Sequence, residues 1–135
     1  MNESRAAMER VLKSTVIPWL RSGGFKGSLP HFRRRGAKAI DLLTFQFDRY
    51  GGGFIVEIAQ CPLEGTTTHW GKAIPPEKVT AWDMDWTSRN RIRAEDKLGT
   101  DGWFRFDTKP PEQLAGLLLT KLADKDLWQN LDLHN

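Results

Sequence analysis

The clearest hydrophobic pattern in the chain lies at residues 39–61, where two runs of apolar residues flank the turn 48–53. Because side chains alternate along a strand, one antiparallel register brings six apolar side chains to a single face. That register pairs Phe47 with Phe54, Phe45 with Val56, and Leu43 with Ile58. The other face then carries Gln46 beside Ile55, Thr44 beside Glu57, and Leu42 beside Ala59. The pattern predicts a β-hairpin at the centre of the fold, and the glycines at 51–53 suit its turn.

A helical period precedes the hairpin. Apolar residues recur every three or four positions between Ser4 and Arg21, with charged residues between them, which predicts an amphipathic helix. Pro18 lacks the N–H that a helix interior needs, so we expect a kink or a break at residues 14–17. Gly23 and Gly24 predict the C-terminal end of this helix.

The segment 25–35 connects the helix to the hairpin and combines turn-forming residues with a short apolar and basic run. It predicts an edge strand beside the hairpin. In this interpretation Arg33, Arg34 and Arg35 keep the exposed edge in solvent.

A second helix is predicted at residues 112–124, where leucines form one stripe. Pro110 and Pro111 stand where proline is tolerated, at the helix start. Asp107 or Thr108 is the expected N-cap.

The remaining elements are shorter. Residues 87–94 and 103–106 have the alternation of strands, although 91–98 would also suit a short helix. A last helix at 126–133 would return three apolar side chains to the sheet, namely Leu127, Trp128 and Leu131.

Residues 63–86 follow neither period and contain several prolines, glycines and tryptophans. Ordered loops of this length are uncommon inside compact domains and are often functional. We therefore expect a specific site in this segment.

Composition changes this picture little. The chain has 135 residues, of which 39% are apolar and 27% charged, and these proportions favour a single globular domain over residues 1–135. Cys61 is the only cysteine, so an intramolecular disulfide is excluded. The N-terminal residues are charged where a signal peptide would be apolar, and no segment is long enough to cross a bilayer. We expect a cytoplasmic protein without a membrane partner.

The formal net charge of +3 is weak support for an anionic partner, but the arginines are clustered. Interleaved with tryptophans, they would suit a nucleic-acid surface, since arginine binds phosphate and tryptophan stacks on bases. The alternative is that the arginines protect strand edges while the tryptophans fill the core. The nucleic-acid interpretation rests on Arg33, Arg34, Arg35, Arg91 and Arg93.

The sequence predicts no metal site and no cofactor. His31, His69 and His134 stand far apart, without metal-ligand spacing. Asp83 and Asp85 would lie on one side of an extended segment, as ligands of a hard cation do, but the flanking tryptophans favour a surface loop.

The sequence also shows no recognisable arrangement of catalytic residues. Cys61 is expected to be a small buried apolar group, because no base stands near it in sequence. The polar side chains of Thr44, Gln46 and Glu57 could form a pocket under a helix, but they are more typical of the solvated face of a sheet. We predict no catalytic residue.

Short motifs distributed over nearly the whole chain resemble the bacterial domain of unknown function 4304. They are G-F-K at residues 24–26, F-R-R-R at 32–35, F-Q at 45–46, F-x-V-x-I at 54–58, and D-x-W-F at 101–104. The resemblance implies an α+β fold with an antiparallel sheet, and it implies no activity. The apolar face of the hairpin is then the expected floor for the N-terminal helix and the C-terminal helices.

These expectations lead to a non-enzymatic binding protein. The leading hypothesis is an immunity protein that covers the active site of a bacterial toxin with residues 63–86 and the neighbouring face of the sheet. An enzyme acting through His69, Asp83 and Asp85 is a third alternative, after nucleic-acid binding. The expected partner-binding residues are Trp70, Trp82, Asp83, Asp85, Trp86 and Arg89, because tryptophan and arginine are common interface anchors.

Overall fold

The computed structural model describes residues 3–95, 99 and 101–129. Its helices are α1 (Glu3–Ser14), α2 (Val16–Ser22) and α3 (Pro111–Leu122), together with the 3₁₀ helices η1 (Ala81–Asp83) and η2 (Trp86–Ser88). Its strands are β1 (Lys26–Ser28), β2 (His31–Arg35), β3 (Ile40–Phe47), β4 (Gly53–Cys61), β5 (Thr66–Thr67), β6 (Ala73–Ile74), β7 (Asn90–Ile92) and β8 (Phe104–Arg105).

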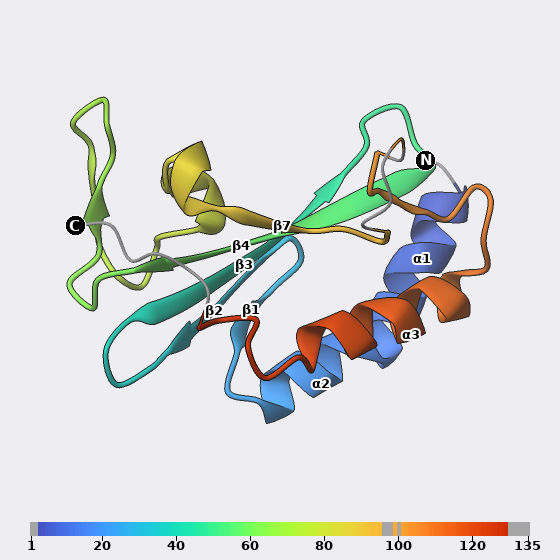
Figure 1. Cartoon of the computed structure of the whole chain (residues 1–135), viewed down its shortest axis with the longest axis horizontal. Helices are drawn as coiled ribbons and strands as arrows, with labels where there is room; N and C mark the ends of the chain where they lie inside the picture. Colours follow the sequence, from blue (N-terminus) through green and yellow to red (C-terminus); the bar gives the residue numbers. More distant parts are fainter. Residues whose placement is uncertain (1–2, 96–98, 100, 130–135) are drawn as a thin grey trace.

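Within the described residues, six strands form one antiparallel sheet in the order β1-β2-β3-β4-β7, and β8 also pairs with β4. The central pair is the hairpin β3–β4, and its register is the predicted one: Phe47 lies opposite Phe54, and Thr44 opposite Glu57. Helices α1, α2 and α3 lie on one side of this sheet, and the η1–η2 segment lies on the other (Figure 1). The predicted α+β fold is confirmed.

The N-terminal helix breaks where proline predicts it. Because Pro18 has no N–H, the Ser14 carbonyl cannot receive its helical hydrogen bond, and Thr15 takes φ −124° between α1 and α2. Helix α2 is capped by Gly23, and Gly24 follows with φ +99°, a conformation that glycine adopts readily.

The connecting segment forms two strands instead of one. β2 pairs with β3, and β1 pairs with residues 31–33 of β2, so Arg33 does not stand at the sheet edge, whereas Arg34 and Arg35 have no partner in β1. The expectation that all three arginines keep an edge in solvent is therefore wrong for Arg33, and Arg34 is half-buried beside Asp41, whereas Arg35 is exposed.

At the other side of the hairpin, β7 and β8 run in the same direction along β4, opposite Val56–Ile58 and Gly53–Phe54 respectively. A hydrogen bond from the Ala94 N–H to the Gly102 carbonyl, of 2.8 Å, closes the loop between them. The two predicted strands are thus one outer strand with an inserted loop. The alternative helix at 91–98 is wrong where it is described, because residues 91–92 belong to β7, and 96–98 lie outside the described residues.

The C-terminal helix α3 is confirmed, but its N-cap is Pro110. Asp107 and Thr108 do not cap it, and the Thr108 hydroxyl instead donates to the Arg105 carbonyl at 3.3 Å. Residues 126–129 form turns where a helix was predicted, and 130–133 lie outside the described residues. Leu127 and Trp128 nevertheless pack against the core, as expected, whereas Leu131 is not described.

The helix-covered face of the sheet carries the main core. Side chains from all three helices pack on the apolar face of the hairpin, and the buried set includes Met8, Leu12, Leu20, Phe45, Phe54, Val56, Ile58, Leu114 and Leu118. Phe54 stacks on Phe104 with ring centroids 4.9 Å apart, which joins β8 to the hairpin. The apolar face is therefore the predicted floor of the helices.

The opposite face is covered as well. The chain between β4 and β7, residues 62–89, folds over it, and we call this segment the excursion. Its Val79 and Ala81 bury a smaller core with Ile40, Leu42 and Ala59. The prediction of a solvated face is wrong, because a long segment without a period of its own packs on the sheet.

No helix among the described residues has the length and apolar character needed to span a membrane.

Candidate functional site

The excursion is an ordered segment held by its own hydrogen bonds. The strands β5 and β6 form a small hairpin, at whose end the Thr68 N–H donates to the Lys72 carbonyl at 2.8 Å. At Gly65, with φ +98°, a Cβ would lie 2.3 Å from the Ile74 carbonyl oxygen, so glycine is required at this close approach. The excursion therefore presents its side chains from a fixed backbone.

Three tryptophans of the excursion face solvent. Trp70 is 61% exposed, Trp82 44% and Trp86 77%. We call these three residues the tryptophan surface. The alternative in which they fill the core is wrong for all three.

Two ring contacts and one polar contact connect the tryptophan surface to its neighbours. The His69 ring meets Trp70 edge-on at 4.8 Å, and His69 Nδ1 lies 3.5 Å from a carboxylate oxygen of Asp85, the residue before Trp86. The ring of Trp82 meets His31 of β2 edge-on at 4.9 Å. The β5–β6 hairpin, the η1–η2 segment and the sheet are thus joined at the surface by short-range contacts.

A row of polar residues crosses the sheet beneath the excursion. The register places Arg91, Glu57, Thr44 and His31 side by side on β7, β4, β3 and β2. Thr44 is fully buried, and Glu57 is 8% exposed. We call these four residues the polar row.

Arg89 supplies a further charge to the polar row. Its Nη1 lies 3.5 Å from Glu57 Oε1, and the Glu57 side chain is 10% exposed. Arg89 Nε is buried and has no hydrogen-bond partner among the described residues. The guanidinium therefore compensates the charge of a carboxylate that burial would otherwise destabilise.

His31 is the titratable end of the polar row. Its Nδ1 lies 2.9 Å from Thr44 Oγ1. Burial lowers the pKa of His31 and the positive charge of Arg33 lowers it further, while Asp83 opposes the change. The imidazole is therefore neutral at pH 7 and serves as a hydrogen-bond partner of Thr44.

Cys61 behaves as the sequence predicts. The side chain is fully buried, and burial raises the pKa of its thiol to about 11. A thiolate is therefore scarce at neutral pH, and Cys61 is a poor nucleophile.

The acidic residues of the excursion have separate roles. Asp83 Oδ2 accepts hydrogen bonds from the N–H and the hydroxyl of Thr80, at 2.8 and 3.2 Å, and so closes the turn of η1. Asp85 precedes η2 and faces His69. The extended arrangement expected for these two residues is wrong, and within the described part of the chain no three His, Cys, Asp or Glu side chains gather as metal ligands.

The arginines of the nucleic-acid interpretation do not share one face. Arg33 and Arg35 lie on the excursion side of β2, where they donate to main-chain carbonyls of Val79 and Leu63. Arg34 lies on the helix side, 2.9 Å from Asp41. Arg91 stands opposite Glu57 on β7, on the same face as Arg33 and Arg35 but separated from β2 by β3 and β4, and Arg93 follows β7 in the chain.

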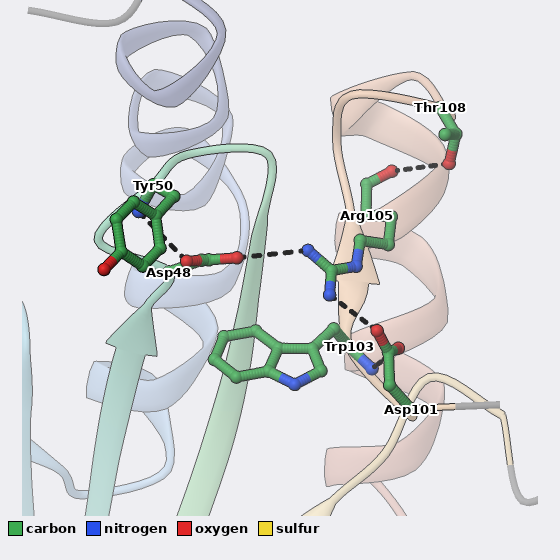
Figure 2. Close-up of polar contacts among 6 residues, drawn as sticks. All are labelled: Asp48, Tyr50, Asp101, Trp103, Arg105 and Thr108. Atoms are coloured by element: carbon green, nitrogen blue, oxygen red, sulfur yellow. Dashed lines mark hydrogen bonds and ion pairs between the residues drawn. The ribbon is translucent and has the colours of Figure 1, made fainter.

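A second polar cluster lies at the turn of the central hairpin, and Figure 2 shows Arg105 between two carboxylates. Arg105 contacts Asp48 at 3.3 Å and Asp101 at 2.5 Å, and Asp101 also accepts the N–H of Trp103 at 3.0 Å. The Arg105 hydrogen bond lowers the pKa of Asp101. These contacts join β8 to the β3–β4 turn, so the D-x-W-F motif at 101–104 supports the fold at this point.

The tryptophans are among the residues predicted from the sequence, whereas the polar row is not predicted as one cluster. The register already placed Thr44 beside Glu57, and that pairing was the available signal. His31 and Arg91 could not be added, because the pairings of β2 and β7 follow from contacts far apart in sequence.

Comparison with curated proteins and with solved structures finds no significant match. A family model described as a domain of unknown function (DUF4304) matches residues 16–131. This match takes in α2, the whole sheet and the excursion with its tryptophan surface, and the chain therefore belongs to the DUF4304 family.

Proposed function

We propose that this protein is a non-enzymatic binding protein whose tryptophan surface docks a protein partner. The observation that carries the proposal is the exposure of Trp70, Trp82 and Trp86 on one ordered segment. Exposed aromatic side chains that gather on a rigid support are typical of protein interfaces, where tryptophan and arginine dominate the binding energy.

The support beneath these side chains favours the same proposal. The excursion packs on the sheet through Val79 and Ala81, and Trp82 rests against His31. Anchors held before the partner arrives lose less conformational freedom on binding. A preformed surface therefore retains more of its contact energy as affinity.

The groups that most resemble catalytic residues already serve the fold. Thr44 is buried against His31, Asp83 closes a turn, and Cys61 is buried with a raised pKa. The exposed side chains of the excursion are instead those of an interface. This contrast favours binding over catalysis.

For the partner, we infer a bacterial toxin in the cytoplasm, which makes the protein an immunity protein. Such a partner must be bound tightly and covered at its active site, and a projecting aromatic surface fits this task. Asp85, which is exposed before Trp86, would add polar specificity at the rim, and Arg89, paired with Glu57, would support this part of the surface from below.

The test is capture of the partner from the native cell by the wild-type protein and by matched variants. Trp70→Ala and Trp86→Ala remove exposed side chains of the tryptophan surface. Trp19→Ala is the control, because Trp19 is 40% exposed on α2, outside the excursion. We expect one protein to be captured by the wild type and by Trp19→Ala, and to be lost with the other two variants.

Two results would count against the proposal. Equal capture by all variants would place the interface elsewhere. Binding of nucleic acid that weakens steeply with salt and is lost in alanine variants of the arginines named for that alternative (Arg33, Arg34, Arg35, Arg91 and Arg93) would favour the alternative function. An immunity role further requires that the captured protein be toxic to cells and that co-expression of this chain prevent the toxicity.

A further inference from the structure

We propose that a pocket between the outer strands of the sheet and the excursion binds a small phosphate monoester. The pocket has a volume of about 330 Å³ and is lined by Lys26, Arg33, Arg35, Ile40, Pro76 and Glu77, with Gly24 at its side. We call it the anion pocket. It lies at the β1–β2 end of the sheet and includes none of the residues of the tryptophan surface.

The sheet register brings the positive charges together. Lys26 lies directly opposite Arg33 across the β1–β2 pair, and Arg35 stands two positions along β2 on the same face. Like charges placed opposite each other in a sheet destabilise it. With Glu77 as the one carboxylate, the lining has a formal charge of +2, which an anion would offset.

The arginines are positioned without being neutralised. Arg33 Nε and Nη2 donate to the Val79 carbonyl at 3.1 and 2.9 Å, and Arg35 Nη1 donates to the Leu63 carbonyl at 3.2 Å. A carbonyl holds a guanidinium in place but carries no net charge. Each guanidinium retains further N–H donors, since arginine has five.

Arg34 shows the contrast. It is the neighbour of Arg33 on the other face of β2 and forms an ion pair with Asp41 at 2.9 Å. By contrast, in the part of the chain that the structure describes, no carboxylate lies at ion-pair distance from Lys26, Arg33 or Arg35. The anion pocket therefore keeps its positive charge.

A phosphate monoester matches this lining better than a carboxylate does. It carries a charge of about −1.5 to −2 at neutral pH and offers three acceptor oxygens, which suit arginine forks. The pocket volume lies at the lower end of the range for small-molecule sites. Ile40 and Pro76 supply an apolar wall for the organic part of a small ligand.

The experiment is a titration monitored by amide NMR at low ionic strength, with phenyl phosphate, inorganic phosphate and benzoate as probes. We expect saturable shifts centred on Gly24, Lys26 and Ile40 with both phosphates, tighter binding of phenyl phosphate, and weaker binding of benzoate. Lys26→Gln and Arg35→Gln should each weaken phenyl phosphate binding by about tenfold, the loss expected for a charge-assisted contact. The control Lys38→Gln, an exposed lysine outside the lining, should bind within about twofold of the wild type.

Thermal unfolding without ligand separates a binding role from a structural one. Lys26→Gln removes one of two opposed like charges, so its melting temperature should equal or exceed that of the wild type even as phosphate binding weakens. Absence of saturable shifts, benzoate binding as tight as phenyl phosphate, or unchanged binding by Lys26→Gln would each overturn the proposal. Binding of a single-stranded oligonucleotide through these residues without phenyl phosphate binding would overturn it in favour of a nucleic-acid site.

Discussion

At the scale of single residues, burial decides which groups are chemically active. Cys61, Thr44 and His31 carry the side chains of reactive sites, yet all three lie under the excursion or in the sheet. The sequence predicted a buried Cys61 because a lone cysteine is usually a small apolar group. It did not predict the burial of Thr44, because the segment that covers this residue lacks any period that would dock it on the sheet.

Cys61 should resist alkylation in the native protein. With its pKa raised to about 11 and its sulfur buried, the thiolate is scarce at pH 8. Mass spectrometry after treatment with iodoacetamide should show modification at least about a hundredfold slower in the folded than in the denatured protein. Similar rates in the two states would mean that the thiol is accessible.

His31 should make stability depend on pH. Burial and Arg33 hold the pKa of folded His31 below 6.5, so below pH 6.5 the unfolded chain binds a proton more readily than the folded one. The contribution of His31 to stability is therefore present above pH 6.5 and is lost as pH falls through the folded pKa.

Urea unfolding between pH 5 and 8 measures this effect. The wild type should lose stability towards pH 5, and His31→Gln should reduce that loss. A wild-type slope retained in full by His31→Gln would contradict the assignment.

At the scale of elements, the central hairpin was predictable and its surroundings were not. Alternation fixes the β3–β4 register because a slip by one residue would invert both faces. The short strands β1, β7 and β8 have too few residues to specify a partner, so their places depend on long-range packing. The helix break followed from Pro18, a local effect.

The hairpin turn should be sensitive to a single methyl group. Gly52 has φ +88°, and a Cβ there would lie 2.6 Å from Asp107 Oδ2. Gly52→Ala should therefore destabilise the protein by more than about 1 kcal/mol in urea unfolding, through backbone strain and this contact. Gly116→Ala is the control, because nothing lies within 4 Å of a Cβ at Gly116 and alanine favours a helix. Equal stability of wild type and Gly52→Ala would show that the turn adjusts freely.

At the scale of the whole molecule, the two faces of the sheet are covered differently. The helix side buries the main core, and the excursion side combines a smaller core with exposed tryptophans. Residues 63–86 are the predicted site because that segment lacks periodicity and is rich in tryptophan. The sequence does not distinguish buried from exposed tryptophans, since both are common, and their exposure follows only from how the excursion packs.

The affinity of the purified partner for matched tryptophan variants measures whether the tryptophan surface is the binding site. Calorimetry should show that Trp86→Ala weakens binding by at least about 30-fold, the loss of a hot-spot side chain worth roughly 2 kcal/mol. Trp19→Ala on α2 should stay within about twofold of the wild type. Equal affinities for Trp86→Ala and the wild type, or a larger loss with Trp19→Ala, would contradict the assignment of the tryptophan surface as the binding site.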